Sequence, residues 1–169
     1  MDRYVISALV NNHSGVLSRI AGLFSRRGYN IDSLTVGVTE NPEISRMTIA
    51  VRGDKFILEQ ITKQLNKLVD VVHLEELDPD NSVFRELIMI KVKATIDRRA
   101  SIIELAGIFK AKIVDVATES LSMEVTGDQA KLSAFINLLQ PYGIAELVRT
   151  GLAGLERGNA TIMENYLKE

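Results

Sequence analysis

A polar loop at residues 11–15, between an apolar segment and an amphipathic one, is the best candidate for ligand chemistry. The first N–H groups of a helix have no partner inside the helix, and the helix dipole adds positive character there. A small carboxylate fits such a place, and Gly15 has no side chain to block its approach. Asn12 adds an amide whose oxygen can accept from an α-ammonium group. Val16 and Leu17 offer apolar surface for a short aliphatic side chain.

The same residues have a simpler interpretation. Ser14 or Asn12 would then only cap the helix, and Gly15 would only turn the chain. Spacing alone favours this capping interpretation, and the ligand site stays open as the alternative.

Catalytic and metal chemistry find little support in the sequence. Cysteine is absent, which excludes disulfides, zinc–thiolate sites and thiol catalysis. His13 and His73 fall in a predicted loop and a predicted strand, without carboxylates at ligand spacing. Glu75 and Glu76 are neighbours, so on a strand they point to opposite faces. The glycine-rich stretch 151–158 opens no clear helix, which indicates a mobile tail rather than a dinucleotide loop. We predict no catalytic residue, no metal site and no cofactor.

The charge balance limits the partners of the chain. Lys and Arg number 20 against 22 Asp and Glu among 169 residues, which gives a net charge of −2 and a pI near 5.8. Nucleic acid and anionic membranes both attract cationic surfaces, so we expect neither as a partner. No apolar run approaches the ~18 residues of a membrane span, and the first residues do not resemble a signal peptide. A cytoplasmic location is expected.

The chain contains an internal duplication. The segment Ala21-Gly22-Leu23-Phe24 recurs as Ala106-Gly107-Ile108-Phe109. A polar segment with a proline separates the copies. The predicted organisation is a first domain at 1–78, a linker at 79–82, a second domain at 83–158 and a C-terminal tail at 159–169.

Each copy shows the element order βαββαβ. In the first copy, the patterns predict strands at 4–10, 31–39, 46–52 and 71–77 around two helices, with Gly28 ending the first helix and Asp54 capping the second. In the second copy, they predict strands at 86–94, 113–118, 121–126 and 144–150, and helices at about 100–109 and 128–139. This order predicts an α+β protein of two ferredoxin-like βαββαβ sandwiches in tandem.

The first strand is apolar on both faces. Val5 and Leu9 alternate with Ile6, Ala8 and Val10, although helices would cover only one face of the sheet. We therefore expect the sister domain or a partner chain to cover the other face.

Several stretches resemble a known family, the small regulatory subunits of acetolactate synthase (acetohydroxyacid synthase), and the unit resembles the ACT domain, an amino-acid-sensing module. The matching stretches are Asn12-His13-Ser14-Gly15-Val16-Leu17-Ser18-Arg19, Gly22-Leu23-Phe24-Ser25-Arg26-Arg27-Gly28-Tyr29-Asn30-Ile31, Ser33-Leu34-Thr35-Val36, Ser45-Arg46-Met47-Thr48, the helix at 58–68 and Arg85-Glu86-Leu87. The second copy matches mainly in layout. Its loop at 95–100 lacks the Asn-x-Ser-Gly pattern, so we do not expect it to bind the same ligand.

The resemblance implies a function without catalysis. Small subunits of this family bind the thiamine-diphosphate-dependent large subunit, raise its activity and confer feedback inhibition by valine or another branched-chain amino acid. ACT domains pair side by side, which implies a homodimer through the first domain, with Leu34, Val36 and Val38 on the exposed edge strand. The implied effector site joins one protomer's loop to the start of the second strand of its partner. The residues are Asn12, Ser14, Gly15, Val16 and Leu17 facing Asn30 and Ile31.

Three alternatives remain. An enzyme on this scaffold would need a nucleophile, metal cluster or cofactor loop that the sequence lacks. An RNA-binding βαββαβ module would need stacking aromatic residues and a basic face, yet the chain has only five Phe, four Tyr and no Trp. The third alternative is a stand-alone ACT-type amino-acid sensor that acts on a different partner protein.

Overall fold

The computed structural model describes residues 2–168, which divide into two compact units. One unit comprises residues 2–83 together with 152–168, and the other comprises residues 84–151. The fold confirms the predicted α+β class, because each unit contains a sandwich of an antiparallel sheet and helices in the order βαββαβ. No helix within the described range is both long and apolar enough to cross a membrane.

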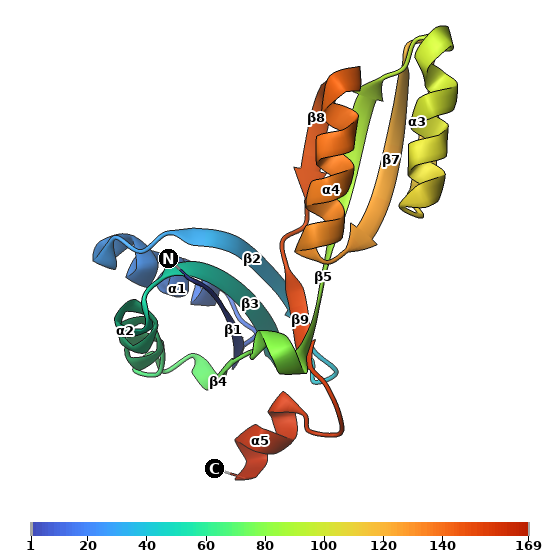
Figure 1. The fold of residues 1–169 in the computed structure, drawn as a ribbon. Coiled ribbons are helices and arrows are strands. Elements are labelled where there is room, and N and C mark those ends of the chain that lie inside the picture. The colour runs from blue at the N-terminus through green and yellow to red at the C-terminus, as the bar shows by residue number, and fades with distance from the viewer. Residues whose placement is uncertain (1, 169) are drawn as a thin grey trace. The chain divides into compact units, whose positions relative to one another are not determined.

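The first unit begins with the predicted sandwich (Figure 1). Its elements are β1 (Asp2–Asn11), α1 (Val16–Arg27), β2 (Ile31–Val38), β3 (Ile44–Gly53), α2 (Lys55–Leu65) and β4 (Val71–Glu76). The strand order is β2-β3-β1-β4, so β2 and β4 form the edges of the sheet. The residues predicted to mark helix boundaries do so. Gly28, with a φ of 69°, ends α1, and Asp54 caps the start of α2, where its side chain accepts from the Ile57 N–H at 2.9 Å.

The two faces of the first sheet are both buried. On β1, Ile6, Ala8 and Val10 belong to the core that α1 and α2 complete. The alternate residues Val5 and Leu9 are also buried, at 6% and 0% exposure, which confirms that something covers the second face. We call this second face, which lies away from α1 and α2, the open face of the first sheet.

The chain's own C-terminal segment, residues 152–168, lies on this face. It contains the buried Leu152, then β9 (Ala153–Glu156) and α5 (Ile162–Lys168). The Leu152 N–H donates to Ser33 Oγ at 2.7 Å, and the Asn165 side-chain amide donates to Glu75 Oε1 at 2.7 Å. The segment therefore belongs to the first unit, whereas the sequence predicted the end of the second domain and a tail. Isolated apolar residues in an irregular segment have no period that would indicate where they pack.

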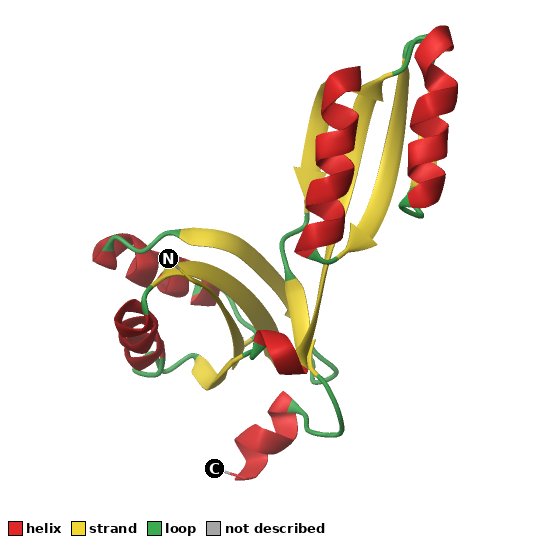
Figure 2. Cartoon of the chain, viewed as in Figure 1, coloured by secondary structure: helices red, strands yellow, loops and turns green. Residues whose placement is uncertain are grey.

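The second unit repeats the sandwich, with both helices on one face of its sheet (Figure 2). Its elements are β5 (Ser82–Lys93), α3 (Ile96–Ile108), β6 (Lys112–Val116), β7 (Ser120–Gly127), α4 (Gln129–Leu139) and β8 (Ile144–Arg149), with a short 3₁₀ turn at Gln140–Tyr142. The first two residues of β5 and the 3₁₀ turn at Pro79–Asn81 belong to the first unit. The strand order is β6-β7-β5-β8. The helix α3 begins at Ile96, four residues before the predicted start at position 100.

Candidate functional site

The candidate site is the loop between β1 and α1. Backbone hydrogen bonds hold its start, because the Asn11 N–H donates to Asp70 O at 2.9 Å and the Asn12 N–H donates to Glu43 O at 2.8 Å. The Asn12 side-chain amide donates to Pro42 O at 2.8 Å, so it is held by the turn between β2 and β3 and does not cap α1.

The N-cap of α1 is Gly15, whose φ of 88° lies in the left-handed region. Residues with a Cβ rarely adopt this conformation. The backbone of the loop therefore favours glycine at position 15, in addition to the room that glycine leaves for a ligand. No side chain accepts a hydrogen bond from the first turn of α1, and this turn contains no acidic residue. The capping interpretation of Ser14 and Asn12 is therefore wrong.

The other three long helices each begin with a carboxylate. Asp54 caps α2, Asp128 caps α4 by accepting from the Lys131 N–H at 2.9 Å, and Asp97 lies in the first turn of α3. A hydrogen bond from the Thr95 side chain lowers the pKa of Asp97 below its ordinary value, and a backbone hydrogen bond acts in the same direction. Among the helices α1 to α4 of the described chain, α1 alone presents its N-terminus without an anion.

Two side chains that the sequence analysis did not single out complete the charge pattern at this loop. The Arg19 guanidinium lies beside Gly15, with Nη1 3.5 Å from the point where a Cβ would stand. The buried carboxylate of Asp70 accepts from Arg19 Nε at 2.6 Å and lies 3.1 Å from His13 Nε2. Arg19 follows the loop by one helical turn, but Asp70 is distant in sequence, so no sequence spacing indicates the Arg19–Asp70 pair.

The predicted site residues fall into two groups within one chain. Asn12, Ser14, Gly15 and Leu17 are exposed at the start of α1, while Val16 is buried in the core. Asn30 and Ile31 lie beyond the other end of this helix, which has 12 residues and is about 18 Å long. The structure of a single chain does not bring the two groups together.

The edge strand β2 carries exposed apolar side chains. Val36 is 44% exposed and Val38 is 62% exposed, whereas Leu34 packs against the core. An edge strand with unpaired backbone groups and exposed valines is a template for pairing with another strand.

The corresponding place in the second unit is built differently. Only two residues separate β5 from α3, so the segment that forms a loop in the first unit is already helical. The Arg99 guanidinium donates to the carbonyl oxygens of Ala94, Ala117 and Thr118. This helix start therefore lacks the glycine loop, as its sequence indicated.

No group of three or more His, Asp or Glu side chains within residues 2–168 is arranged to hold a metal ion. Each histidine instead lies beside a carboxylate, since His73 Nε2 is 3.1 Å from Glu75 Oε1.

Comparisons with known proteins agree with this architecture. Residues 6–73 match the family described as "AHAS small subunit-like ACT domain", and residues 85–158 match the "Small subunit of acetolactate synthase". A βαββαβ unit with this match is an ACT domain, and the chain carries it in tandem with a second ferredoxin-like unit.

Full-length relatives show the family. The chain is 52% identical to a probable acetolactate synthase small subunit of Methanothermobacter thermautotrophicus, over 95% of this chain and 96% of that protein. It is 52% identical to the acetolactate synthase small subunit of Mycolicibacterium smegmatis, over 92% and 91% of the two chains. The crystal structure of the small subunit from Thermotoga maritima matches with a TM-score of 0.87 and 44% identity, over 95% of this chain and 100% of that one. The chain belongs to the family of acetolactate synthase small subunits.

Proposed function

We propose that this chain is the regulatory subunit of an acetolactate synthase. It binds the thiamine-diphosphate-dependent catalytic subunit, raises its activity and makes it sensitive to feedback inhibition by valine or another branched-chain amino acid. The chain itself contributes no catalytic residue and no cofactor. The family membership of the whole chain supports the pairing, because its relatives are named as small subunits.

The main support for an effector site at the start of α1 is that no side chain caps the N-terminus of this helix. An amino-acid carboxylate supplies the anion that Asp54, Asp97 and Asp128 supply at the other helices. The Arg19 guanidinium lies beside Gly15, and while its Nε donates to Asp70, its Nη1 and Nη2 face the loop and are the donors nearest to Gly15. Hydrogen bonds to a charged group contribute about 1.5–3 kcal/mol each, so two or three of them dominate the binding of so small a ligand.

A homodimer through β2 supplies the second half of the site. Pairing of β2 with its symmetry mate is isologous, so it closes on itself and covers the exposed valines of both edges. Asn30 and Ile31 at the start of β2 are then contributed by the partner, which accounts for their distance from the loop within one chain. In this arrangement Leu17, which is 47% exposed, contacts the aliphatic side chain of the effector.

Reconstitution of the two subunits tests the proposal. Acetolactate formation from pyruvate is measured for the catalytic subunit alone, for this chain alone and for the mixture, each with and without valine, leucine or isoleucine. We expect this chain alone to form no acetolactate and the mixture to be more active than the catalytic subunit. One of the three amino acids should inhibit the mixture and leave the catalytic subunit alone unaffected.

Two outcomes would contradict the proposal. Turnover by the rigorously purified chain would make it an enzyme. Failure to co-purify with the catalytic subunit, combined with tight binding of an amino acid, would instead support a stand-alone sensor with another partner.

A further inference from the structure

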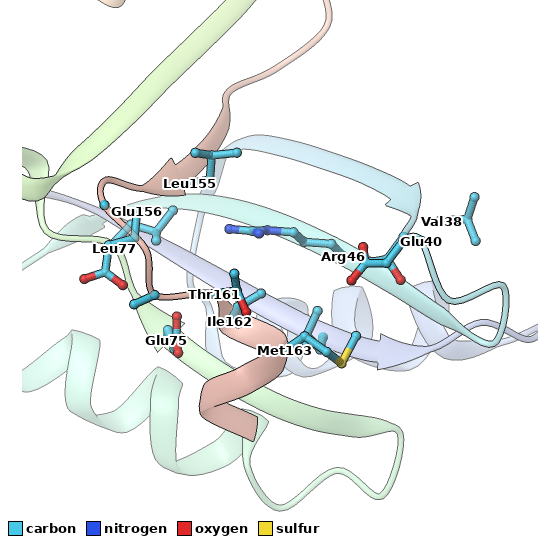
Figure 3. A pocket seen from close by; sticks show the side chains of 14 residues that line it. Val38, Glu40, Arg46, Glu75, Leu77, Leu155, Glu156, Thr161, Ile162 and Met163 are labelled. Carbon is cyan, nitrogen blue, oxygen red and sulfur yellow. The ribbon is translucent and has the colours of Figure 1, made fainter. Parts of the chain in front are cut away.

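A cavity of about 430 Å³ lies between the open face of the first sheet and the C-terminal segment (Figure 3). Leu9 of β1, Arg46 of β3 and Glu75 of β4 line its floor, and the opposite wall is built from residues 155–163. Cavities of this size accommodate small organic molecules. The cavity is separate from the loop before α1, because α1 packs on the other face of the sheet.

Arg46 is the unusual residue of this cavity. Its Nη2 donates to Gly154 O at 2.9 Å, but its Nε is fully buried and has no hydrogen-bond partner. No carboxylate of the described chain forms an ion pair with this guanidinium within 4.0 Å. Burial lowers the pKa of Arg46, and the more distant carboxylates Glu75 and Glu40 only partly offset this effect. The half-buried guanidinium also lines the cavity, so a ligand that offers it a hydrogen-bond acceptor there would pair with it.

The surrounding carboxylates limit the charge of that ligand. Glu75 lies 3.1 Å from His73 Nε2 and accepts from Asn165, while Glu156 accepts from the Asn81 side chain at 2.9 Å. Glu40 is the third carboxylate that lines the cavity. Three negative groups around one guanidinium repel a phosphate ester or a dicarboxylate. A single carboxylate that reaches the Arg46 guanidinium from the cavity pairs with its charge at the least repulsion.

The remaining walls are apolar. Leu9 and Leu77 come from the sheet, and Leu155, Ile162 and Met163 come from the C-terminal segment. Figure 3 shows the Arg46 side chain extending between Leu155 and Ile162. These side chains suit a short aliphatic body and offer no aromatic ring for stacking.

We propose that this cavity binds a small aliphatic monocarboxylate, with Arg46 as its anchor. A free carboxylic acid and an amino acid share this chemistry. The bound molecule contacts both the sheet and the C-terminal segment, so its binding also stabilises the segment on the open face. The proposal goes beyond the regulatory function above, because it concerns a second site on the opposite face of the sheet from α1.

Calorimetric titration of the full chain with 3-methylbutanoate tests the site, with L-leucine and isopentylamine as the other two arms. We expect the acid to bind and the amine not to bind. The L-leucine arm distinguishes the two sources of the carboxylate. Binding of L-leucine at this cavity would show that it also accepts an ammonium group near Glu40, and binding of the acid alone would show that the ligand is a free carboxylic acid. Binding of the amine in place of the acid would overturn the assignment of Arg46 as anchor.

The variant Arg46→Met should weaken binding of 3-methylbutanoate by at least about 10-fold, because one charge-assisted contact is lost. The matched control is Arg157→Met, which removes the same charge from an exposed position of the C-terminal segment and should leave binding unchanged. Since Arg46→Met also removes the contact with Gly154, a second variant, Ala160→Phe, fills the cavity and keeps that contact. Both cavity variants should lose binding while circular dichroism shows a folded protein.

Hydrogen exchange gives an independent readout. Saturation with 3-methylbutanoate should slow exchange in residues 157–168 of the wild type and have no effect on this segment in Ala160→Phe. Undiminished binding by both cavity variants would overturn the proposal. Loss of binding in Ser18→Asp, a variant in the first turn of α1, would also overturn it, because the probe would then occupy the effector site.

Discussion

The two units share one topology but differ at the start of their first helix and on the outer face of their sheet. In the second unit, Asp97 provides a carboxylate within the first turn of α3, and the Arg99 guanidinium donates to the carbonyl oxygen of Ala94 just before the helix. In the first unit, Gly15 leaves the N-terminus of α1 without a carboxylate. The comparison indicates that a duplicated scaffold keeps its core positions while one copy leaves the N-terminus of its first helix without a side-chain cap.

The outer faces differ in the same way. In the first unit, Val5 and Leu9 are buried, and Leu9 lines a cavity together with residues of the C-terminal segment. In the second unit, Met89 and Val148 on the corresponding face are 45% and 53% exposed. The strand sequences reflect this, because β1 is apolar on both faces whereas Met89 in β5 is followed by Lys91 and Lys93.

The largest expected effect is on dimerisation, and it distinguishes the edge strand β2 of the first unit from the edge strand β6 of the second. Val36→Lys on β2 should convert the dimer to a monomer, raising its dissociation constant by about 1000-fold or more, because the contact would bury an unpaired charge. Sensitivity to the effector should be lost with the dimer. The matched control is Val114→Lys on the edge strand β6, since both valines are 44% exposed.

Sedimentation velocity of both variants at micromolar concentration decides the question. A monomer for Val114→Lys and a dimer for Val36→Lys would place the dimer contact in the second unit.

The next effect concerns the helix end. Gly15→Asp should raise the effector concentration for half-inhibition about 100-fold, which corresponds to about 3 kcal/mol, because the new carboxylate competes for the same N–H groups. The φ of 88° at Gly15 also makes any side chain there strained, at a cost of about 1–2 kcal/mol in unfolding free energy. Ser18→Asp places a carboxylate in the same turn without this strain and should raise the half-inhibition concentration about 10-fold.

Inhibition curves of the reconstituted enzyme measure both effects. The control in the second unit is Ala100→Asp, the position equivalent to Gly15 in the duplication, which should leave inhibition unchanged. If Gly15→Asp and Ser18→Asp both retain normal inhibition, the effector binds elsewhere.

A third prediction addresses the outer faces. Leu152→Ala should lower the unfolding free energy of the first unit by about 2–3 kcal/mol, because Leu152 is only 5% exposed. Val148→Ala, at 53% exposure in the second unit, should change stability by less than about 0.5 kcal/mol. Urea titration followed by hydrogen exchange separates the two units. Equal effects of the two variants would mean that the C-terminal segment contributes little to covering the first sheet.

The smallest effect is a pH dependence in the second unit. The pKa of Asp97 is lowered in the folded state, so its stabilising contribution is present above its ordinary pKa of 3.8 and is lost as pH falls through the folded value. Asp97→Asn should therefore be slightly less stable than the wild type at neutral pH and equal to it in strong acid. Hydrogen exchange in α3 at several pH values measures this difference. A difference that persists in acid would show that the charge of Asp97 is not its cause.

Local signals let the sequence predict much of the fold. The alternation of strands with amphipathic helices predicted both βαββαβ units, and Gly28 and Asp54 marked helix ends where the structure has them. The predicted start of α3 was wrong. Alignment with the first copy places the helix start near position 100, whereas Thr95 is the N-cap of α3 and Asp97 lies in its first turn.

The sequence by itself determined the topology of the two units, the apolar second face of β1 and the glycine at the loop, since these depend on neighbouring residues. Only the tertiary structure decided that Leu152 and the following segment pack on that face, that Asp70 joins Arg19 and His13, and that Arg46 Nε is buried without a hydrogen-bond partner. These contacts join residues that are far apart in the chain: 51 positions for Arg19 and Asp70, 108 for Arg46 and Gly154, and 119 for Ser33 and Leu152. Short-range periodicity carries no information about such pairs, because they form only when the chain is packed.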